Sequence, residues 1–220
     1  MKPSGSRLQI SGLYVIIDPQ QTQGRDPVEV ARQALRGGAR ILQWRDKTRD
    51  KGEQLAPARS LRQLCSEQGA LFIVNDHVDL ALACAADGVH LGQKDLPVNA
   101  VRPWAPAGFL IGVSTNNAEE ACQAERDGAD YVAVGSIFPT GSKETTRPAS
   151  PERLREVKQA VGIPVVAIGG INEENIAQVL EAGADAVAVI SAVCGAEDAE
   201  EATRRLAANF GERGSRAPGT

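Results

Sequence analysis

The chain has few aromatic residues, no excess of positive charge and no long apolar run. Aromatic residues make up 4% of its 220 residues and the formal net charge is −4, so a nucleic-acid partner is not expected. No apolar run approaches the ~20 residues needed to span a bilayer, and residues 1–12 lack the apolar segment of a signal peptide. We therefore expect a cytoplasmic protein without a membrane partner.

Cysteine and histidine are also scarce. The four cysteines are far apart and never form a Cys-x-x-Cys pair, and neither histidine lies near one, so a zinc or redox site has no support and buried cysteines are expected. His90 alternates with Val89 and Leu91, which favours a hydrogen-bonded core histidine over a catalyst. No Ser-His-Asp arrangement is visible, so nucleophilic catalysis has no candidate.

What the chain does contain is a repeated phrase, in which a small residue and usually an aspartate precede an apolar run. It occurs at residues 85–92, 128–135 and 183–190, with a fainter copy at 37–44. Further apolar runs alternate with these copies, at residues 13–17, 72–74, 110–113 and 164–168. The phrase is typical of a helix end, a tight turn and a buried strand. The runs together predict eight strands.

Amphipathic stretches between the runs predict helices. They span residues 27–36, 52–68, 78–85, 118–126, 151–160, 173–182 and 198–209, with a shorter stretch at 98–104. Eight alternations of buried strand and helix favour an α/β fold, a single-domain (β/α)8 TIM barrel. An open doubly wound sheet would need a Gly-x-Gly-x-x-Gly after the first strand, and residues 18–21 are not one. We expect the barrel over residues 12–210, with flexible tails at 1–11 and 211–220.

Polar residues follow several predicted strands, at the end where such barrels carry their active sites. Gln43 and Arg45 are two residues apart, so both should point into the barrel while Leu42 and Trp44 face the helices. Lys47 continues the inward side if the chain stays extended. Two interpretations remain open: an ion pair that plugs the core, or cations that bind an anionic ligand.

Two aspartates follow neighbouring predicted strands. Asp76 and Asp95 could each simply cap the helix that comes next, which is the more frequent role for either one alone. Adjacent strands end side by side, however, so the two carboxylates should reach one hard cation. Mg²⁺ typically takes one or two carboxylates and completes its shell with water and phosphate oxygens. Aspartates and cations together therefore predict a site for a metal-bound polyphosphate.

The second half of the chain carries features typical of phosphate binding. The loop at residues 136–148 is rich in hydroxyl and basic residues, which suits either a phosphate-gripping lid or a solvated loop. Gly169 and Gly170, with Asn172 expected to open a helix, lie beside residues 190–192 at the expected end of the last strand. They predict a phosphate site after strands seven and eight. Ser114, at the end of strand five, adds a hydrogen-bonding group.

Taken in order, these segments make the chain similar to the thiamine-phosphate synthase family. The resemblance runs from Leu13 to Ala192, and single segments such as Ile-Gly-Gly-Ile are weak whereas the ordered set is specific. It rests on residues 43–47 (QWRDK), 74–81 (VNDHVDLA), 90–93 (HLGQ), 112–114 (GVS), 135–140 (GSIFPT), 167–171 (AIGGI) and 188–191 (AVIS).

The resemblance implies a transferase of thiamine biosynthesis. Such an enzyme joins 4-amino-2-methyl-5-pyrimidinylmethyl diphosphate to hydroxyethylthiazole phosphate, with Mg²⁺ assistance and dissociative loss of pyrophosphate, and releases thiamine phosphate. Its partners would be these phosphorylated small molecules, and the sequence leaves open whether the protein is a homo-oligomer.

Residue by residue, the resemblance also implies roles. The pyrimidine diphosphate would be bound by Gln43, Arg45, Lys47, Asn75, Ser114 and Lys143. The thiazole phosphate would be bound by Thr140, Ser142, Gly170, Ile190 and Ser191. Mg²⁺ would be bound by Asp76 and Asp95. The expected catalytic residues are Arg45, Lys47, Ser114 and Lys143.

The chain departs from the family pattern in places, and two rivals remain. Ser142 replaces a threonine of the usual Thr-x-Thr-Lys, Asn116 and Lys94 stand where histidine and an acidic residue are common, and Ser150 replaces a glycine. A thiazole tautomerase on the same barrel would place a histidine at Ser136 and lack the paired aspartates. A catalytically silent phosphate-binding barrel is the other rival.

Overall fold

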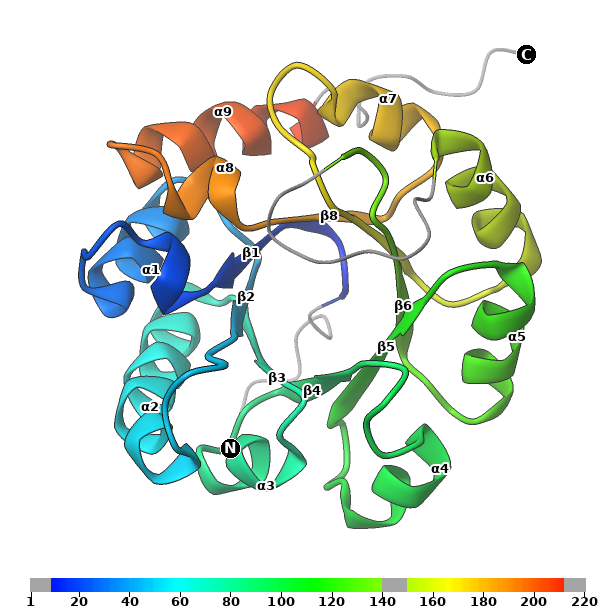
Figure 1. Ribbon diagram of the computed structural model, residues 1–220, viewed down its shortest axis with the longest axis horizontal. Helices are drawn as coiled ribbons and strands as arrows, with labels where there is room; N and C mark the ends of the chain where they lie inside the picture. Colours follow the sequence, from blue (N-terminus) through cyan, green and yellow to red (C-terminus); the bar gives the residue numbers. More distant parts are fainter. Residues whose placement is uncertain (1–8, 140–149, 212–220) are drawn as a thin grey trace.

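The computed structural model describes residues 9–139 and 150–211. Eight parallel strands close a barrel in sequence order, and helices surround it (Figure 1). The strands are β1 (Gly12–Ile17), β2 (Ile41–Trp44), β3 (Leu71–Asn75), β4 (Gly88–Leu91), β5 (Leu110–Thr115), β6 (Tyr131–Val134), β7 (Val165–Ile168) and β8 (Ala186–Val189). The predicted (β/α)8 barrel is confirmed. The boundaries expected at residues 12 and 210 stay predictions, although Ile10 is already buried against the barrel interior.

The helices alternate with the strands along the chain. They are α1 (Pro27–Arg36), α2 (Lys51–Gln68), α3 (Val78–Ala83), α4 (Val98–Val101), α5 (Ala118–Arg126), α6 (Pro151–Ala160), α7 (Ile176–Glu181), α8 (Ser191–Cys194) and α9 (Ala199–Gly211), with single 3-10 turns η1 (Pro19–Gln21) and η2 (Arg102–Trp104). The predicted bounds of α1, α5 and α6 are confirmed. Ser150 caps α6, because its hydroxyl accepts from the backbone amide of Arg153 at 3.3 Å.

Two apolar clusters make up the core. The larger cluster fills the space between the strands and the helices and contains Leu42 and Trp44, as predicted. Cys65, Cys84 and Cys194 are buried, while Cys122 is only half-buried, and all four are free. The smaller cluster fills the barrel interior, where inward-facing residues of several strands meet: Tyr14, Ile16, Ile41, Leu71, Ile73, Tyr131, Ala133, Val166, Ala186 and Ala188. This packed interior lies beneath the C-terminal ends of the strands, where the mouth of the barrel is, and supports it.

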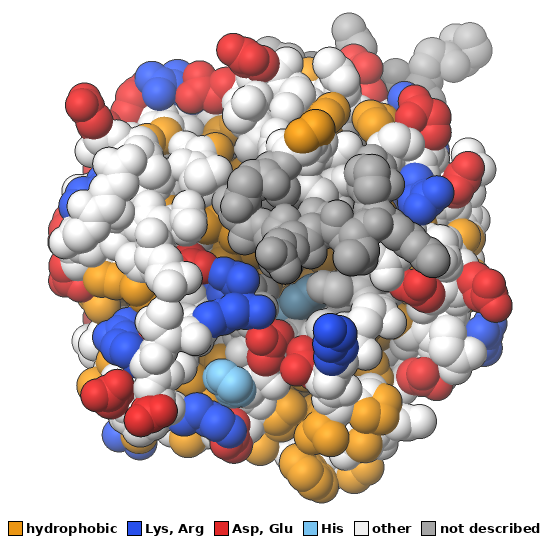
Figure 2. Space-filling model, in the orientation of Figure 1, with side chains coloured by type: hydrophobic (Ala, Val, Ile, Leu, Met, Phe, Trp, Pro, Cys, Tyr) orange, Lys and Arg blue, Asp and Glu red, His pale blue; other side chains and the backbone are white. Residues whose placement is uncertain are grey.

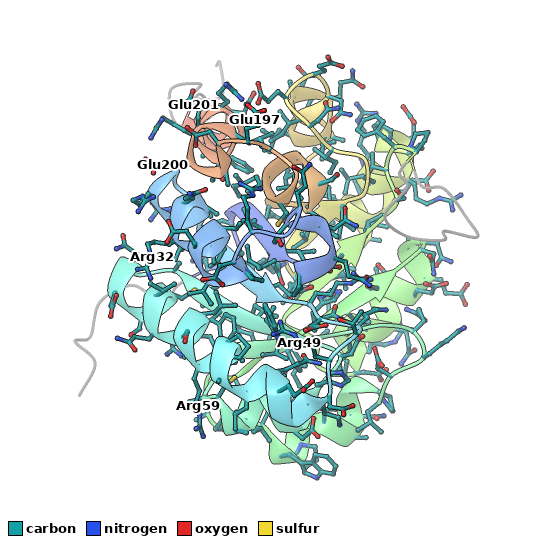
Figure 3. All side chains as sticks on the ribbon, turned by 60° about the vertical axis from the view of Figure 1, so that its left-hand side comes forward. Arg32, Arg49, Arg59, Glu197, Glu200 and Glu201 are labelled. Carbon is teal, nitrogen blue, oxygen red and sulfur yellow. The ribbon has the colours of Figure 1, made fainter. Side chains whose placement is uncertain are left out.

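Ion pairs cover the outer helical layer. Figure 3 shows the side with α1, α2 and α9, where the labelled Arg32, Glu200 and Glu201 project from these helices. Glu200 accepts from Arg36 and from Arg204, each at 2.7 Å. Such exposed pairs contribute about 0–1 kcal/mol each to the free energy of unfolding, so they add little to the stability of the fold. Over residues 9–139 and 150–211, no helix has the length and apolar character needed to cross a bilayer.

Candidate active site

The end of β2 carries a buried ion pair. The side chain of Gln43 lies in the barrel, where its amide nitrogen donates to the Tyr14 hydroxyl at 2.7 Å. Arg45 is 9% exposed and its guanidinium binds the carboxylate of Asp18, which follows β1 and is 2% exposed. Arg45 is therefore ion-paired within the protein, and its role toward an anionic ligand stays a prediction. A guanidinium carries five N–H donors, and a single carboxylate can accept from no more than part of them.

Asp46 anchors the turn between Arg45 and Lys47. Its carboxylate accepts from the backbone amide of Thr48 at 2.9 Å, from the Thr48 hydroxyl at 2.8 Å and from the amide of Arg49 at 3.2 Å. Burial alone would raise the pKa of Asp46, but these bonds outweigh it and lower the pKa to about 2. The Asp46 carboxylate is therefore ionised at neutral pH and holds the turn, which leaves Lys47 exposed at the mouth.

Asp76 and Asp95 lie side by side after β3 and β4. Burial raises the pKa of Asp76, and the charge of Asp95 and a hydrogen bond shared with it raise that pKa further, against the lowering effect of Lys47. Asp76 has a left-handed backbone with φ of 61°, and its amide donates to the His90 carbonyl at 2.8 Å. The register between β3 and β4, in which Asn75 lies opposite His90, brings the two loops together.

Neither aspartate caps the helix that follows it. The N-cap positions of α3 and α4 are His77 and Pro97, and neither helix has a side-chain cap bond there. Asp95 instead accepts from the Gly92 amide at 2.6 Å and so closes its own turn. The cap interpretation is wrong for both residues, which leaves their carboxylates directed at each other.

Asp76, whose pKa is raised, and the neighbouring Asp95 converge on a site that a cation would stabilise. Within the described parts of the chain, no group of three or more carboxylate, imidazole or thiol side chains could enclose a metal ion. Oxygen ligands from only two carboxylates fit Mg²⁺, which keeps its other positions for water and phosphate oxygens. Asp76 and Asp95 are the residues that would hold it.

A cavity of about 570 Å³ occupies the other half of the mouth. Four of the predicted site residues line it: Ser114, Gly170, Ile190 and Ser191. Gly169 and Gly170 have positive φ of 99° and 65°, and a Cβ atom on Gly170 would lie 2.6 Å from the Pro139 carbonyl. The loops after β6 and β7 approach each other so closely that only glycine fits.

Two local expectations in this half are wrong. Asn172 does not open a helix, because its amide donates to the Asn175 side chain at 2.9 Å and α7 begins only at Ile176. Side-chain bonds of this kind compete with helix formation. Residues 190–192 do not end a strand either: β8 stops at Val189, and Ser191 is the first residue of α8.

Figure 2 shows the face that carries the mouth, with basic and acidic side chains gathered over the ends of β2 to β4. The structure thus brings Arg45, Lys47, Asp76 and Asp95 to one side of the mouth and places Ser114 beside the cavity. Thr140, Ser142 and Lys143 lie outside the described residues, and their roles stay predictions.

Sequence reasoning missed two residues of this site. Asp18 follows a predicted strand just as Asp76 does, so its position was a usable signal. Gln93 lines the cavity, and its amide donates to the Ser114 carbonyl. Gln93 belongs to the His90–Gln93 segment, yet only the register between β4 and β5 reveals its partner.

The chain is similar to known proteins over most of its length. A family model described as thiamine monophosphate synthase matches residues 13–193. Thiamine-phosphate synthases of Methanospirillum hungatei and Shouchella clausii are 50% and 48% identical over 197 and 201 residues. These spans are 89% and 91% of this chain and 96% of each relative.

Solved structures give the same answer. Thiamine phosphate pyrophosphorylase from Pyrococcus furiosus superposes with a TM-score of 0.87 at 45% identity, covering 94% of this chain and 98% of that one. A 3-hexulose-6-phosphate synthase superposes with a TM-score of 0.71 at 18% identity, covering 90% of this chain and 99% of that one. This likeness shows the fold alone. The chain is therefore a transferase that belongs to the thiamine-phosphate synthase family.

Proposed function

We propose that the chain joins 4-amino-2-methyl-5-pyrimidinylmethyl diphosphate to hydroxyethylthiazole phosphate and releases thiamine phosphate and pyrophosphate. The observation that carries this proposal is the division of one barrel mouth into two unlike halves. The half after β1 to β4 holds paired carboxylates and cations, and the half after β5 to β8 is a neutral cavity lined by glycine and serine. One half suits a metal-bound diphosphate and the other a monophosphate.

The chemistry asks little of acid–base groups. In a dissociative order, the carbon–oxygen bond to pyrophosphate breaks first, while the aminopyrimidine supports the electron-poor methylene carbon. The lone pair of the thiazole nitrogen then forms the new carbon–nitrogen bond. No proton is removed, so no general base is needed. This fits a mouth whose buried histidine, His90, is already hydrogen-bonded to Tyr131 and Ser114.

Stabilising the departing pyrophosphate is the main task. Arg45 and Lys47 would bind its oxygens, with Asn75 beside them, and preorganised donors of this kind are worth about 10²–10³ in rate each. Mg²⁺, held by Asp76 and Asp95, would neutralise charge on the same group. Gln43 and Ser114 would bind the pyrimidine ring between the two halves. Lys143 would add a further cation.

The thiazole phosphate would lie in the neutral half. Gly170, Ile190 and Ser191 line that cavity, and their backbone and hydroxyl groups suit a phosphate. Thr140 and Ser142 would close over it. The tautomerase alternative has less support, because Ser136 stands where that enzyme would place a histidine, and the Ser136 hydroxyl donates to the Phe138 carbonyl at 2.7 Å.

The direct test incubates the purified protein with both phosphorylated substrates and Mg²⁺. Thiamine phosphate and pyrophosphate should appear in equal amounts, and chelation of the metal should abolish both. Isomerisation of the thiazole phosphate alone, without any condensation, would favour the tautomerase. Binding of both phosphates with no turnover would favour the silent barrel.

A further inference from the structure

A hydrogen-bonded chain crosses the barrel interior and joins the two residues assigned to the pyrimidine ring. The Gln43 amide nitrogen donates to the Tyr14 hydroxyl at 2.7 Å, and the hydroxyls of Tyr14 and Tyr131 are 3.2 Å apart. The Tyr131 hydroxyl is 3.2 Å from Nδ1 of His90, and Nε2 of His90 is 3.0 Å from the Ser114 hydroxyl. Gln43 and Ser114 therefore lie at the two ends of one continuous chain.

The members of this chain are held rigidly. Tyr131 is fully buried and its ring stacks on His90 with centroids 5.6 Å apart. In the register of β5 and β6, Gly112 lies opposite Tyr131, and any side chain at Gly112 would overlap that ring. Burial raises the pKa of both Tyr14 and Tyr131 far above the usual value, so each hydroxyl keeps its single proton. No other tyrosine occurs in the sequence.

Counting protons gives the chain a direction. Tyr14 accepts from Gln43. If each hydroxyl proton is donated to the next group in line, the Tyr14 proton goes to the Tyr131 oxygen and the Tyr131 proton goes to Nδ1 of His90. His90 is then the neutral tautomer that carries its proton on Nε2 and donates it to the Ser114 oxygen. Ser114 is left to donate its own proton into the cavity that it lines. At the other end, Gln43 is left to present its amide oxygen.

We propose that Tyr14, Tyr131 and His90 are positioning residues that fix Gln43 as an acceptor and Ser114 as a donor, and so select a 4-aminopyrimidine over its 4-oxo counterpart. This inference rests on the proposed function. A 4-aminopyrimidine offers an amino donor next to a ring-nitrogen acceptor, whereas the 4-oxo form offers a carbonyl acceptor next to an N–H donor. Because the ring is tethered through its methylene group, the carbonyl oxygen of the 4-oxo form would face the Gln43 amide oxygen, and two acceptors cannot form a hydrogen bond.

Inhibition constants test the selectivity without involving reactivity. The 4-amino and 4-oxo forms of 2-methyl-5-hydroxymethylpyrimidine monophosphate serve as competitive inhibitors against the pyrimidine diphosphate. The wild-type protein should prefer the amino form by at least about 10²-fold. Tyr131→Phe removes the hydroxyl that passes the direction along, so the preference should fall at least about tenfold. Tyr14→Phe should act in the same sense because it frees the Gln43 amide to turn.

A matched control separates this effect from general destabilisation. Thr203 in α9 is fully buried and its hydroxyl donates to the Ala199 carbonyl at 2.6 Å, so Thr203→Val also removes a buried hydroxyl, but in the outer helical layer. Its preference should equal that of the wild type. A wild-type preference in Tyr131→Phe, or the same loss in Thr203→Val, would overturn the proposal.

The tautomer can be read in the wild-type protein alone. With ¹⁵N-labelled histidine, the ring nitrogens of His90, assigned by their loss in His90→Gln, should show the proton on Nε2 at neutral pH. A proton on Nδ1, or on both nitrogens, would contradict the proposed direction of the hydrogen bonds. A wild-type protein that makes no thiamine phosphate but shows the Nε2–H tautomer would instead contradict the proposed function and leave the proposed hydrogen-bond direction standing.

Discussion

The two halves of the barrel mouth are built from different types of residue. After β1 to β4, the loops place aspartates and cations close together, and Asp18, Asp46 and Asp95 each hold a neighbour in place. After β5 to β8, glycines and a short helix leave a neutral cavity. Charge is costly to bury without a partner, so the charged half is braced by ion pairs and hydrogen bonds. The neutral half needs only room, which glycine provides.

This contrast implies that the halves should fail in different ways. Substitutions in the charged half should affect the metal and the diphosphate, whereas substitutions in the neutral half should affect only the monophosphate. Effects that cross from one half to the other would contradict this division.

The largest expected effect comes from the paired aspartates. Asp76→Ala or Asp95→Ala should lower kcat by about 10²-fold or more, because the remaining carboxylate cannot position the metal. Steady-state rates over a range of Mg²⁺ concentrations measure this. Asp79→Ala is the control, since Asp79 is an exposed carboxylate of α3 paired with Lys51 at 2.7 Å. Wild-type rates at limiting Mg²⁺ in either mutant would remove the metal assignment.

The next effect is on stability. Asp18→Ala leaves the Arg45 guanidinium buried without its partner, which typically costs about 3–5 kcal/mol. Urea denaturation should show this loss, and Asp18→Ala combined with Arg45→Met should recover much of it. Equal stability of the single mutant and the wild type would mean that Arg45 is held by other groups.

In the neutral half, Gly170→Ala should raise the KM for the thiazole phosphate about tenfold, in line with a strain of about 1–3 kcal/mol. The KM for the pyrimidine diphosphate should stay unchanged. Gly69→Ala is a matched control, because Gly69 has φ of 66° but nothing within 4 Å of an added Cβ. A rise in both KM values for Gly170→Ala would show that the halves are coupled.

The smallest effect is expected for Ser191→Ala. One hydroxyl bond to a phosphate contributes about 0.5–1.5 kcal/mol, so the KM for the thiazole phosphate should rise a few-fold with kcat preserved. The same mutant should leave the Mg²⁺ dependence of the rate untouched. A large fall in kcat would instead place Ser191 in the charge-stabilising machinery.

Much of this organisation follows from the sequence because buried strands and amphipathic helices have strong periodic patterns. Those patterns predict the bounds of α1 and α5 and the opposite directions of Gln43 and Trp44. Strand order in a barrel then predicts that Asp76 and Asp95 meet. Features that depend on particular contacts could not be predicted in this way. The turn stabilised by Asn172 and Asn175 delays the start of α7, and this turn has no periodic sequence pattern.

The hydrogen-bonded series inside the barrel could not be predicted from the sequence for a different reason. His90 on β4 and Tyr131 on β6 are not neighbours in the sheet, and they meet because Gly112 leaves space between them. The sequence indicates a hydrogen-bonded core histidine, which is confirmed, but not its partners. Such contacts depend on side-chain volume inside the closed barrel.

We propose above all that Asp76 and Asp95 hold one divalent ion against a pyrophosphate bound by Arg45 and Lys47. A crystal structure with Mn²⁺ and pyrophosphate tests it most directly. We expect a single anomalous peak between the two carboxylates, bridged to pyrophosphate oxygens that also contact both cations. An ion bound elsewhere, with Arg45 contacting only Asp18, would contradict it.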